Sequence, residues 1–573
     1  MKSTKTKINS NISQEYSRHN VSRVIRFKRL PDYVDDVAAT NNSLRQALKR
    51  LSEGTDDTPR SWFYEDKPAE WIIQQVSAEL DAMRELNNIA EWDLSKSDKF
   101  APQGGSAPLI DRLSSFEEYF QHLERPQIVR DSKWREAKAT TAKFLGFNQS
   151  GTPLSLEQVA IRGMHENKYF TNSGFPDYTK RKNPQTMHNA ITAAENGEYL
   201  KYPFTLGTRA TMGKTHEEAR NIFMAPMATN LAGQRFVLPV MDYLRTVRLR
   251  KRNLQGSSGL NGFRYFFTPW EGWEKCQQVI SRNWDKGLKF GADYSKMDQH
   301  FNIYHALEVF DVIKFYFQRQ YWEDLRMNIM HVFHAPVITN LGYVDQDHAM
   351  PSGSEWTNFL ETVWNLIFNV YMYIKYHLGY DSAMGIGDDQ LFILSDWNVG
   401  RPDSKRTEKR LEGITNLYIS QFEYAGLPGN AEKQEVGFEE TGFLQRLLAS
   451  DWSGLDGKTR AAGVYSLIRN TTSQVYPERY YNAAEWTSDM FALRVIMIAE
   501  NANQHPLFKW YVQSFIANAN KNILEFVRKR DSEIKAVESQ AKRIAGFIPT
   551  YNQEKQDQSI LSFDCFKLLR ELV

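Results

Sequence analysis

Two adjacent acidic residues stand between two apolar runs, and this pattern constrains the fold more than any other part of the chain. In residues 383–394, Gly387, Asp388 and Asp389 interrupt a stretch that is otherwise mostly apolar. Glycine and aspartate tolerate turn dihedral angles, so the pattern predicts a strand, a tight turn and a second strand. Two carboxylates would then lie side by side at the tip of a buried hairpin. Divalent cations would offset their repulsion, whereas an ordinary exposed turn is the alternative interpretation.

Two further segments precede this hairpin. In residues 288–301 a short apolar run leads into Asp293, and Asp298 follows five positions later. In residues 350–365 a Ser-Gly loop leads into a helix that we expect to begin near Ser354, because apolar residues recur there at three- and four-residue spacing. An Asp at a strand end, a loop that feeds a helix and an acidic hairpin, in this order, predict the palm of a template-directed nucleic-acid polymerase.

In such a palm, Asp293 and Asp388 would bind two divalent ions about 3.5–4 Å apart, with Asp389 assisting. One ion would lower the pKa of the attacking 3′-hydroxyl, and the other would steady the leaving pyrophosphate. The start of the following helix presents hydroxyl and amide groups beside a glycine, and we expect these residues to bind the nucleotide: Ser352, Gly353, Thr357 and Asn358. A simple helix cap is the alternative role for Ser352.

The three segments resemble motifs of the RNA-dependent RNA polymerases of double-stranded RNA viruses, in the picobirnavirus and partitivirus group. Residues 293–298 (Asp-Tyr-Ser-Lys-Met-Asp) resemble their motif A, residues 351–358 (Pro-Ser-Gly-Ser-x-x-Thr-Asn) their motif B and residues 387–390 (Gly-Asp-Asp-Gln) their motif C. The resemblance implies an α+β right-hand fold with fingers, an antiparallel palm sheet and a largely helical thumb. It also implies RNA-directed RNA synthesis with Mg²⁺, or Mn²⁺, as the cofactor.

Two weaker matches lie in the basic part of the chain. Residues 208–223 resemble motif F, in which Arg220 is the best match for the arginine that binds the triphosphate, followed by Arg209 and Lys214. A triphosphate needs cations opposite the metals, although a solvated stretch with internal ion pairs is the alternative. Residues 171–176 resemble motif G at the template entrance. The residues expected to contact RNA there are Thr171, Ser173, Gly174, Lys180, Arg181 and Lys182.

Two more matches follow the palm motifs. Residues 430–433 resemble motif D, which makes Lys433 a candidate general acid for the leaving pyrophosphate, with a surface lysine as the alternative. Residues 442–446 resemble motif E, which places Arg446 near the primer or nascent strand.

The choice of sugar can also be predicted. Asp298, assisted by Thr357 or Asn358, is a polar partner for a 2′-hydroxyl, which favours ribonucleotides. In positive-strand relatives an Asn lies four positions after the motif B threonine, and Glu361 takes that position here. A reverse transcriptase, and a non-catalytic RNA-packaging protein with a polymerase fold, are the alternative functions.

We expect four regions along the chain. They are an N-terminal arm (1–60), fingers with motifs G and F (61–285), a palm with motifs A to E and a fingers insertion near 305–345 (286–450), and a thumb with the C-terminal tail (451–573). Residues 161–260 carry 15 basic and 7 acidic side chains, whereas the net charge of the whole chain is only +2. Such a basic lobe predicts a track for a polyanion. Part of this excess is a basic run at 245–252, which is a candidate contact for the RNA backbone.

Composition excludes several other classes of protein. Hydrophobic residues make up 41% and charged residues 24%, which excludes a largely disordered chain. Two cysteines are too few for a disulfide scaffold or a Cys-based zinc site, and no apolar run is long enough to span a bilayer. The expected partners are an RNA template and product, ribonucleoside triphosphates and a viral capsid protein. The expected location is the virion interior or the host cytoplasm, with no membrane contact.

Overall fold

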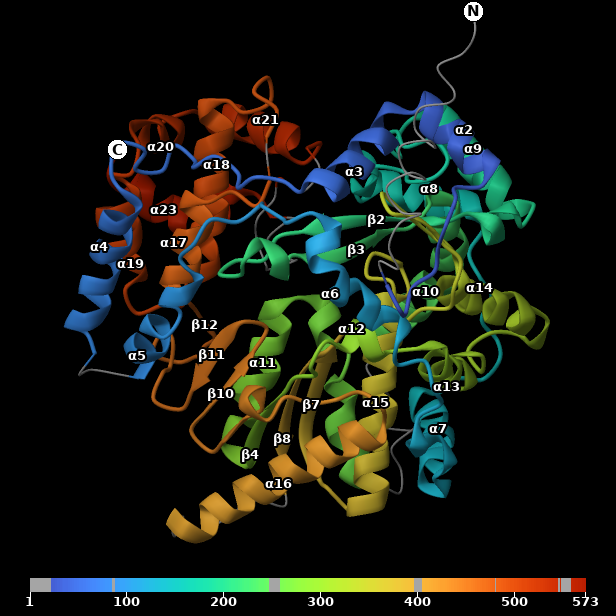
Figure 1. Cartoon of the computed structure of the whole chain (residues 1–573). Coiled ribbons are helices and arrows are strands. Elements are labelled where there is room, and N and C mark those ends of the chain that lie inside the picture. The colour runs from blue at the N-terminus through green and yellow to red at the C-terminus, as the bar shows by residue number, and fades with distance from the viewer. Residues whose placement is uncertain are drawn as a thin grey trace, which may run out of the picture.

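The computed structural model describes residues 22–84, 88–246, 258–395, 404–479, 481–544, 547 and 558–573. Within these residues three sheets lie among many helices, so the architecture is α+β (Figure 1). Residues 1–21 of the expected arm and residues 248–252 of the basic run lie outside the described residues. No helix in the described part of the chain is both long and apolar enough to cross a membrane.

A four-stranded sheet, here called the palm sheet, contains the predicted acidic hairpin. Its order is β7-β8-β4-β9, with antiparallel pairing throughout. The strands are β4 (Leu288–Ala292), β7 (Tyr380–Ile386), β8 (Asp389–Leu394) and β9 (Glu435–Gly437). Ile386 pairs with Asp389, which leaves Gly387 and Asp388 as the turn between β7 and β8. A small third sheet follows in the chain and consists of β10 (Glu440–Phe443), β11 (Arg446–Ala449) and β12 (Val464–Tyr465).

Helices cover the palm sheet and share one large core with it. They include α7 (Ser132–Leu145), α13 (Ile303–Ile313), α15 (Thr357–Tyr376) and α16 (Ser404–Tyr424). The helix expected to begin near Ser354 is α15, and it begins at Thr357. The reason is a turn in which the Ser354 N–H donates to the Pro351 carbonyl at 3.2 Å. α15 is buried on nearly all sides over Phe359–Met372, because it lies between other helices and β7.

A five-stranded sheet forms the base of the expected fingers. Its order is β1-β6-β5-β2-β3, and its strands are β1 (Phe27–Lys28), β2 (Phe204–Arg209), β3 (Arg220–Met224), β5 (Val337–Thr339) and β6 (Gly342–Val344). Two N-terminal helices, α2 (Asp32–Thr40) and α3 (Asn42–Glu53), bury leucine and valine side chains in the same core as β2. Residues 22–53 of the expected N-terminal arm are therefore a packed part of this lobe.

The C-terminal helices form a lobe with its own core, shown in orange and red in Figure 1. They include α17 (Leu467–Val475), α18 (Ser488–Ala499), α20 (Lys521–Val527), α21 (Asp531–Ala541) and α23 (Asp564–Arg570). The N-terminal helix α4 (Ala69–Ala82) packs into this core through Ile72, Val76 and Leu80. Residues 61–82 were expected in the fingers. They lie on the thumb instead, because the apolar face of α4 is buried against α17.

Candidate active site

The three predicted aspartates lie at one end of the palm sheet. Asp293 directly follows β4, Asp388 lies in the turn after β7, and Asp389 begins β8. Because Ala292 pairs with Gln390, the end of β4 lies beside this turn. All three aspartates line one cleft of about 370 Å³. Segments separated by almost one hundred residues thus bring their carboxylates to one space.

Buried polar side chains of α15 hold the acidic turn in place. The Gly387 N–H donates to the Thr362 hydroxyl at 2.8 Å, and the Asn365 side-chain amide donates to the Gly387 carbonyl at 2.7 Å. Gly387 has a φ of +57°, which glycine adopts without steric cost. Asn365 also accepts a hydrogen bond from the Tyr294 hydroxyl at 2.7 Å. One buried amide therefore ties the turn to the residue after Asp293.

The carboxylates concentrate negative charge at this end of the palm sheet. Burial, followed by the charges of Asp293 and Asp298, raises the pKa of Asp388 to about 6. Burial and the charge of Asp388 raise the pKa of Asp389 well above its ordinary value. A hydrogen bond from the Leu444 N–H at 3.0 Å only partly compensates Asp389. A cation would stabilise this arrangement, and oxygen donors of this kind suit magnesium.

The donor type fits divalent ions, but the side chains do not yet surround one point. Within the described ranges, no three His, Cys, Asp or Glu side chains are close enough together to hold an ion. Lys433 Nζ lies 3.1 Å from Asp293 Oδ2, and Asp389 is turned toward Leu444. Lys433 therefore occupies one of the two carboxylate oxygens with which Asp293 could bind a divalent ion.

The segment that carries Lys433 is fixed against the segment after β4. The Gln434 side-chain amide donates to the Asp293 carbonyl at 2.5 Å, and the Ser295 N–H donates to the Pro428 carbonyl at 2.7 Å. The Lys433 side chain itself is 53% exposed. Its backbone is therefore positioned, while its ammonium can move within the cleft that Lys433 also lines.

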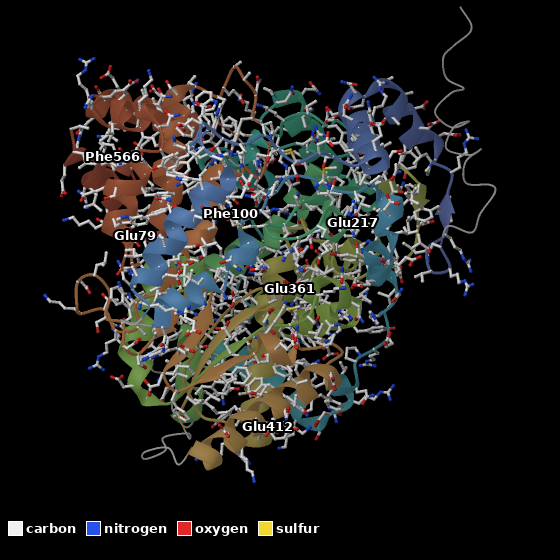
Figure 2. The ribbon with its side chains drawn as sticks, turned by 60° about the vertical axis from the view of Figure 1, so that its left-hand side comes forward. Glu79, Phe100, Glu217, Glu361, Glu412 and Phe566 are labelled. Atoms are coloured by element: carbon white, nitrogen blue, oxygen red, sulfur yellow. The ribbon has the colours of Figure 1, made fainter. Side chains whose placement is uncertain are left out.

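Asp298, Ser352 and Glu361 form a second polar cluster. The Ser352 hydroxyl donates to the Asp298 carboxylate. Glu361 lies near the centre of the molecule (Figure 2) and is only 4% exposed. Burial, the charge of Asp298 and a hydrogen bond with Asp298 raise the pKa of Glu361 well above its ordinary value. Tyr119 also hydrogen-bonds to Ser352; no motif indicated Tyr119 in the sequence.

The other predicted nucleotide-binding residues surround this cluster. Gly353 has a φ of +114°, and a Cβ there would lie 2.5 Å from the Phe223 carbonyl oxygen, so no side chain fits. The Phe223 N–H donates to the Ser352 carbonyl at 2.8 Å, and this hydrogen bond joins β3 to the loop that contains Gly353. The Thr357 hydroxyl donates back to a carbonyl of the same loop at 3.2 Å. Asn358 is exposed, and its Oδ1 accepts from the Trp270 indole at 3.0 Å.

The three motif F cations have different surroundings. Arg209 and Arg220 are directly opposite each other on β2 and β3. Arg209 pairs with Glu478 of the C-terminal lobe at 2.5 Å, and Lys214 pairs with a glutamate four residues on at 2.8 Å. Arg220 is exposed, and its charge acts to lower the pKa of Asp388. Among the three, Arg220 is thus the cation whose field reaches the aspartates.

The predicted motif G residues divide into exposed and buried groups. The exposed ones are Thr171, Lys180 and Lys182. Ser173 is 2% exposed and Gly174 is buried, and the Ser173 backbone is hydrogen-bonded to Thr179 and Met227. Arg181 Nε donates to the Asn172 carbonyl at 3.1 Å, and burial lowers the Arg181 pKa. The side chains available to RNA at this loop are therefore mainly the two lysines and Thr171.

Arg446 lines the cleft, but most of its side chain is held by protein contacts. Its side chain is 3% exposed, and Nη1 donates to the Asn501 carbonyl at 3.0 Å. The guanidinium also lies over the Trp273 and Tyr465 rings, 4.7 and 5.6 Å from their centroids. These contacts join β11 to the C-terminal lobe, and they leave little of the guanidinium exposed to a ligand in the cleft.

Sequence reasoning also missed residues that line the cleft. They are Trp92, Lys96, Glu435 and Arg469. Two belong to the segment that contains α5 (Asn88–Leu94), and Arg469 belongs to α17. Glu435 begins β9 and pairs with β4, whereas the other three meet the aspartates only through long-range packing of the N-terminal segment on the thumb, which no local pattern marks.

No family model matches the chain. The chain is 24% identical over 487 residues to the potential RNA-dependent RNA polymerase of human picobirnavirus (strain Human/Thailand/Hy005102/-), with 82% of this chain and 83% of that protein covered. Two similar solved structures are the RNA-dependent RNA polymerase of a human picobirnavirus and its insertion loop deletion mutant. Each aligns with a TM-score of 0.75 and 20% identity, over 95% of this chain and 100% of the other. The fingers–palm–thumb fold is thereby confirmed, and the chain is similar in sequence and in fold to the RNA-dependent RNA polymerases of picobirnaviruses.

Proposed function

We propose that this chain is a viral RNA-directed RNA polymerase, which joins ribonucleotides on an RNA template. The observation that carries the proposal is the placement of Asp293, Asp388 and Asp389 around one cleft at the end of the palm sheet. The similarity to a picobirnavirus polymerase over most of both chains supports the same function.

Asp293 and Asp388, with Asp389 beside them, are the residues that would hold Mg²⁺ or Mn²⁺. The bound ions supply activation of the 3′-hydroxyl and neutralisation of the charge that develops on the triphosphate. Lys433 pairs with Asp293 in this structure, 3.1 Å away, and its ammonium has the reach and charge to protonate the leaving pyrophosphate.

Arg220 and the cluster around Asp298 form the side of the site that receives the incoming nucleotide. The exposed Arg220 can pair with the triphosphate, because a guanidinium binds phosphate oxygens in a bidentate manner. Asp298 with Ser352, and the exposed Asn358, offer polar partners to the ribose. The buried Glu361 hydrogen-bonds to Asp298 and so helps to hold it in this cluster. The exposed Thr171, Lys180 and Lys182 are the residues of the 171–182 segment that would contact the template backbone.

Primer extension with purified protein tests the proposal. Wild-type protein with an annealed RNA primer–template, four ribonucleoside triphosphates and Mg²⁺ should extend the primer. Asp388→Ala should abolish extension while the protein stays folded, whereas Asp324→Asn, at an exposed carboxylate on α14 (Trp322–His334), should leave it unchanged. Retained synthesis by the Asp388 variant would refute the assignment. Efficient use of deoxyribonucleotides instead would identify a reverse transcriptase.

The remaining partners follow from a viral polymerase function. We place the protein in the virion interior or the host cytoplasm, with RNA, ribonucleoside triphosphates and a viral capsid protein as partners. Co-purification of the chain with capsid protein from assembled particles tests the last of these, and its absence from purified particles would contradict the virion location and the capsid partner.

A further inference from the structure

The cleft has an aromatic and basic wall that the proposed mechanism does not use. Trp92 and Lys96 come from the segment of α5, and Arg469 comes from the first turn of α17. All three side chains are partly buried, and Lys96 Nζ lies 5.3 Å from the centroid of the Trp92 ring. This wall lines the same space as the three aspartates.

A buried polar cluster fixes this wall. The Asp93 carboxylate, which is fully buried, accepts hydrogen bonds from the Ser466 hydroxyl and from the N–H groups of Leu467 (2.7 Å) and Ile468 (3.2 Å) at the start of α17. His505 Nε2 lies 3.2 Å from the same carboxylate. An anion bonded to free N–H groups at a helix start is well stabilised, so Asp93 locks α5 onto α17.

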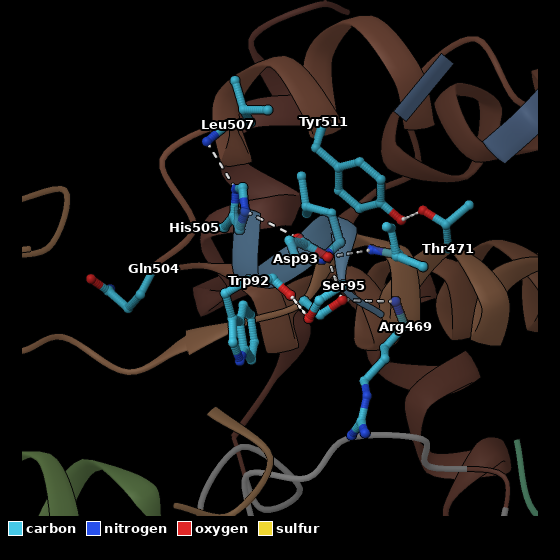
Figure 3. Close-up of polar contacts among 12 residues, drawn as sticks. Trp92, Asp93, Ser95, Arg469, Thr471, Gln504, His505, Leu507 and Tyr511 are labelled. Atoms are coloured by element: carbon cyan, nitrogen blue, oxygen red, sulfur yellow. Dashed lines mark hydrogen bonds and ion pairs between the residues drawn. The ribbon is translucent and has the colours of Figure 1, made fainter. Parts of the chain in front are cut away.

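The hydrogen bonds of Asp93 with the start of α17 fix the direction of the neighbouring side chains. Trp92 directly precedes Asp93, Lys96 follows it by three residues, and Arg469 lies three residues after the Ser466 cap. Figure 3 shows the Trp92 ring and the Arg469 side chain pointing to the same side, away from Tyr511. The two elements therefore present one aromatic ring and two cations together.

The wall holds positive charge close together. Burial lowers the pKa of Lys96, and the nearby charge of Arg469 lowers it further. Arg469 Nη1 donates to Gln445 Oε1 at 2.8 Å, but the buried Arg469 Nε makes no hydrogen bond with any described residue. The carboxylate that faces Lys96 is Glu435, whose own pKa is raised by burial. Although Glu432 and Glu435 also line the cleft, the two adjacent cations and the unused guanidinium donor give this wall groups that can pair with a phosphate.

The wall lies on the thumb side of the aspartates. Arg220 and the Asp298–Ser352 pair, which face the incoming nucleotide, come from β3 and from the loops after β4 and before α15, and none of them lines this cleft. The cleft is lined instead by the palm turn, by the 442–446 segment and by the thumb wall. A polymerase needs a second nucleotide beside its carboxylates, which carries the attacking 3′-hydroxyl.

We propose that Trp92, Lys96 and Arg469 form the binding site for the nucleotide that carries the attacking 3′-hydroxyl. The Trp92 ring packs on the nucleoside, and the two cations pair with the phosphate on its 5′ side. This inference rests on the proposed polymerase function. The nucleotide can be a free initiating ribonucleoside triphosphate or the 3′ end of the nascent strand, since both present the same chemistry. A cleft of about 370 Å³ is within the range of small-ligand sites.

Two assays on the full-length protein test the site. The first measures unprimed synthesis while the concentration of the initiating nucleotide varies. The second measures extension of an annealed primer, with separate determination of primer–template affinity and of the KM for the incoming nucleotide. The variants are Trp92→Ala, Lys96→Gln and Arg469→Gln, with Trp92→Phe as the conservative change and Arg528→Gln, at an exposed thumb position, as the control.

The Lys96 and Arg469 variants should raise the KM for the initiating nucleotide about tenfold, as expected for a lost charge-assisted contact. Trp92→Ala should raise it about fivefold or more, and Trp92→Phe should stay near wild type because it keeps a stacking ring. The KM for the incoming nucleotide on an annealed primer should change less than twofold. A loss of primer–template affinity with an unchanged initiation KM would support the nascent-strand source instead.

The proposal fails if both initiation KM and primer affinity stay within twofold of wild type in all three variants. It also fails if the KM for the incoming nucleotide rises by the same factor as the initiation KM or the dissociation constant of the primer–template. Equal thermal unfolding midpoints for variants and control separate these outcomes from misfolding. Wild-type protein that extends no primer would refute the polymerase function itself, which is a different result from wild-type activity with unaffected variants.

Discussion

Replacing Asp388 with Asn tests whether the acidic turn carries a charge that only a cation relieves. Folding raises the pKa of Asp388 from 3.8 to about 6. An acid of this kind destabilises the folded state above its folded pKa and has no effect below its unfolded pKa. The full shift corresponds to about 3 kcal/mol at neutral pH. Water reaches Asp388 at the exposed tip of the turn and screens its charge, so we expect a destabilising free energy of about 1–1.5 kcal/mol.

The measurement is the thermal unfolding midpoint of the two proteins in EDTA. At pH 8 the Asp388→Asn variant should unfold at a temperature about 1–3 °C above wild type, because the uncompensated charge is gone. At pH 5 the difference should be about half as large, since the folded carboxyl is then mostly protonated while the unfolded one is still mostly ionised. Addition of Mg²⁺ at pH 8 should stabilise wild type more than the variant.

The same variant should make no RNA, so stability and activity should move in opposite directions. The exposed Asp324→Asn variant should change neither. A midpoint for Asp388→Asn equal to or below that of wild type at pH 8 would contradict the charge argument. An equal response of both proteins to Mg²⁺ would contradict the assignment of Asp388 as a metal ligand.

Further changes test single roles in the site. Asp298→Ala should reduce the preference for ribonucleotides about tenfold or more in single-nucleotide incorporation, because a polar partner of the 2′-hydroxyl is lost; an unchanged ratio of kcat/KM values would exclude Asp298 as the sugar sensor. Lys433→Leu should lower kcat about 100-fold while Lys433→Arg retains part of it, and an unaffected rate would show that this lysine is not the acid. Arg209→Gln and Glu478→Gln should each cost less than about 1 kcal/mol, because the pair is exposed. A larger coupling energy in their double-mutant cycle would show that this fingers–thumb contact is more than a surface ion pair.

The palm was predictable because its chemistry lies in short local segments. The apolar runs on both sides of Gly387 predicted β7 and β8, and β4 ends directly before Asp293 as expected. The elements against which each helix packs were harder to predict from the sequence. α4 has an apolar face that indicates a helix, but the face of α17 that covers it is almost 400 residues away in the chain. Periodicity shows that a helix buries one side, not which element it meets.

The thumb wall illustrates the same limit for the site. The Asp93 carboxylate and the Ser466 hydroxyl that binds it are 373 residues apart. Nothing in the local sequence distinguishes an Asp that is hydrogen-bonded to another lobe from an Asp that is exposed to solvent. The contact between Asp93 and Ser466 positions Trp92 and Lys96, so their place in the cleft could not be predicted from neighbouring residues.

Arg446 and Arg469 show why a motif match fixes a position but not a direction. Arg446 lies on β11, and pairing with both β10 and β12 determines the face of the sheet to which its side chain points. That face meets Trp273 and Tyr465, so the motif E guanidinium is used in packing. Arg469 lies on a helix whose start is held by Asp93, and its side chain reaches the cleft. Arg446 and Arg469 both line the cleft, but protein contacts cover the Arg446 guanidinium. We therefore expect Arg469, together with Lys96, to be the cation that a polyanionic product meets on the thumb side of the aspartates.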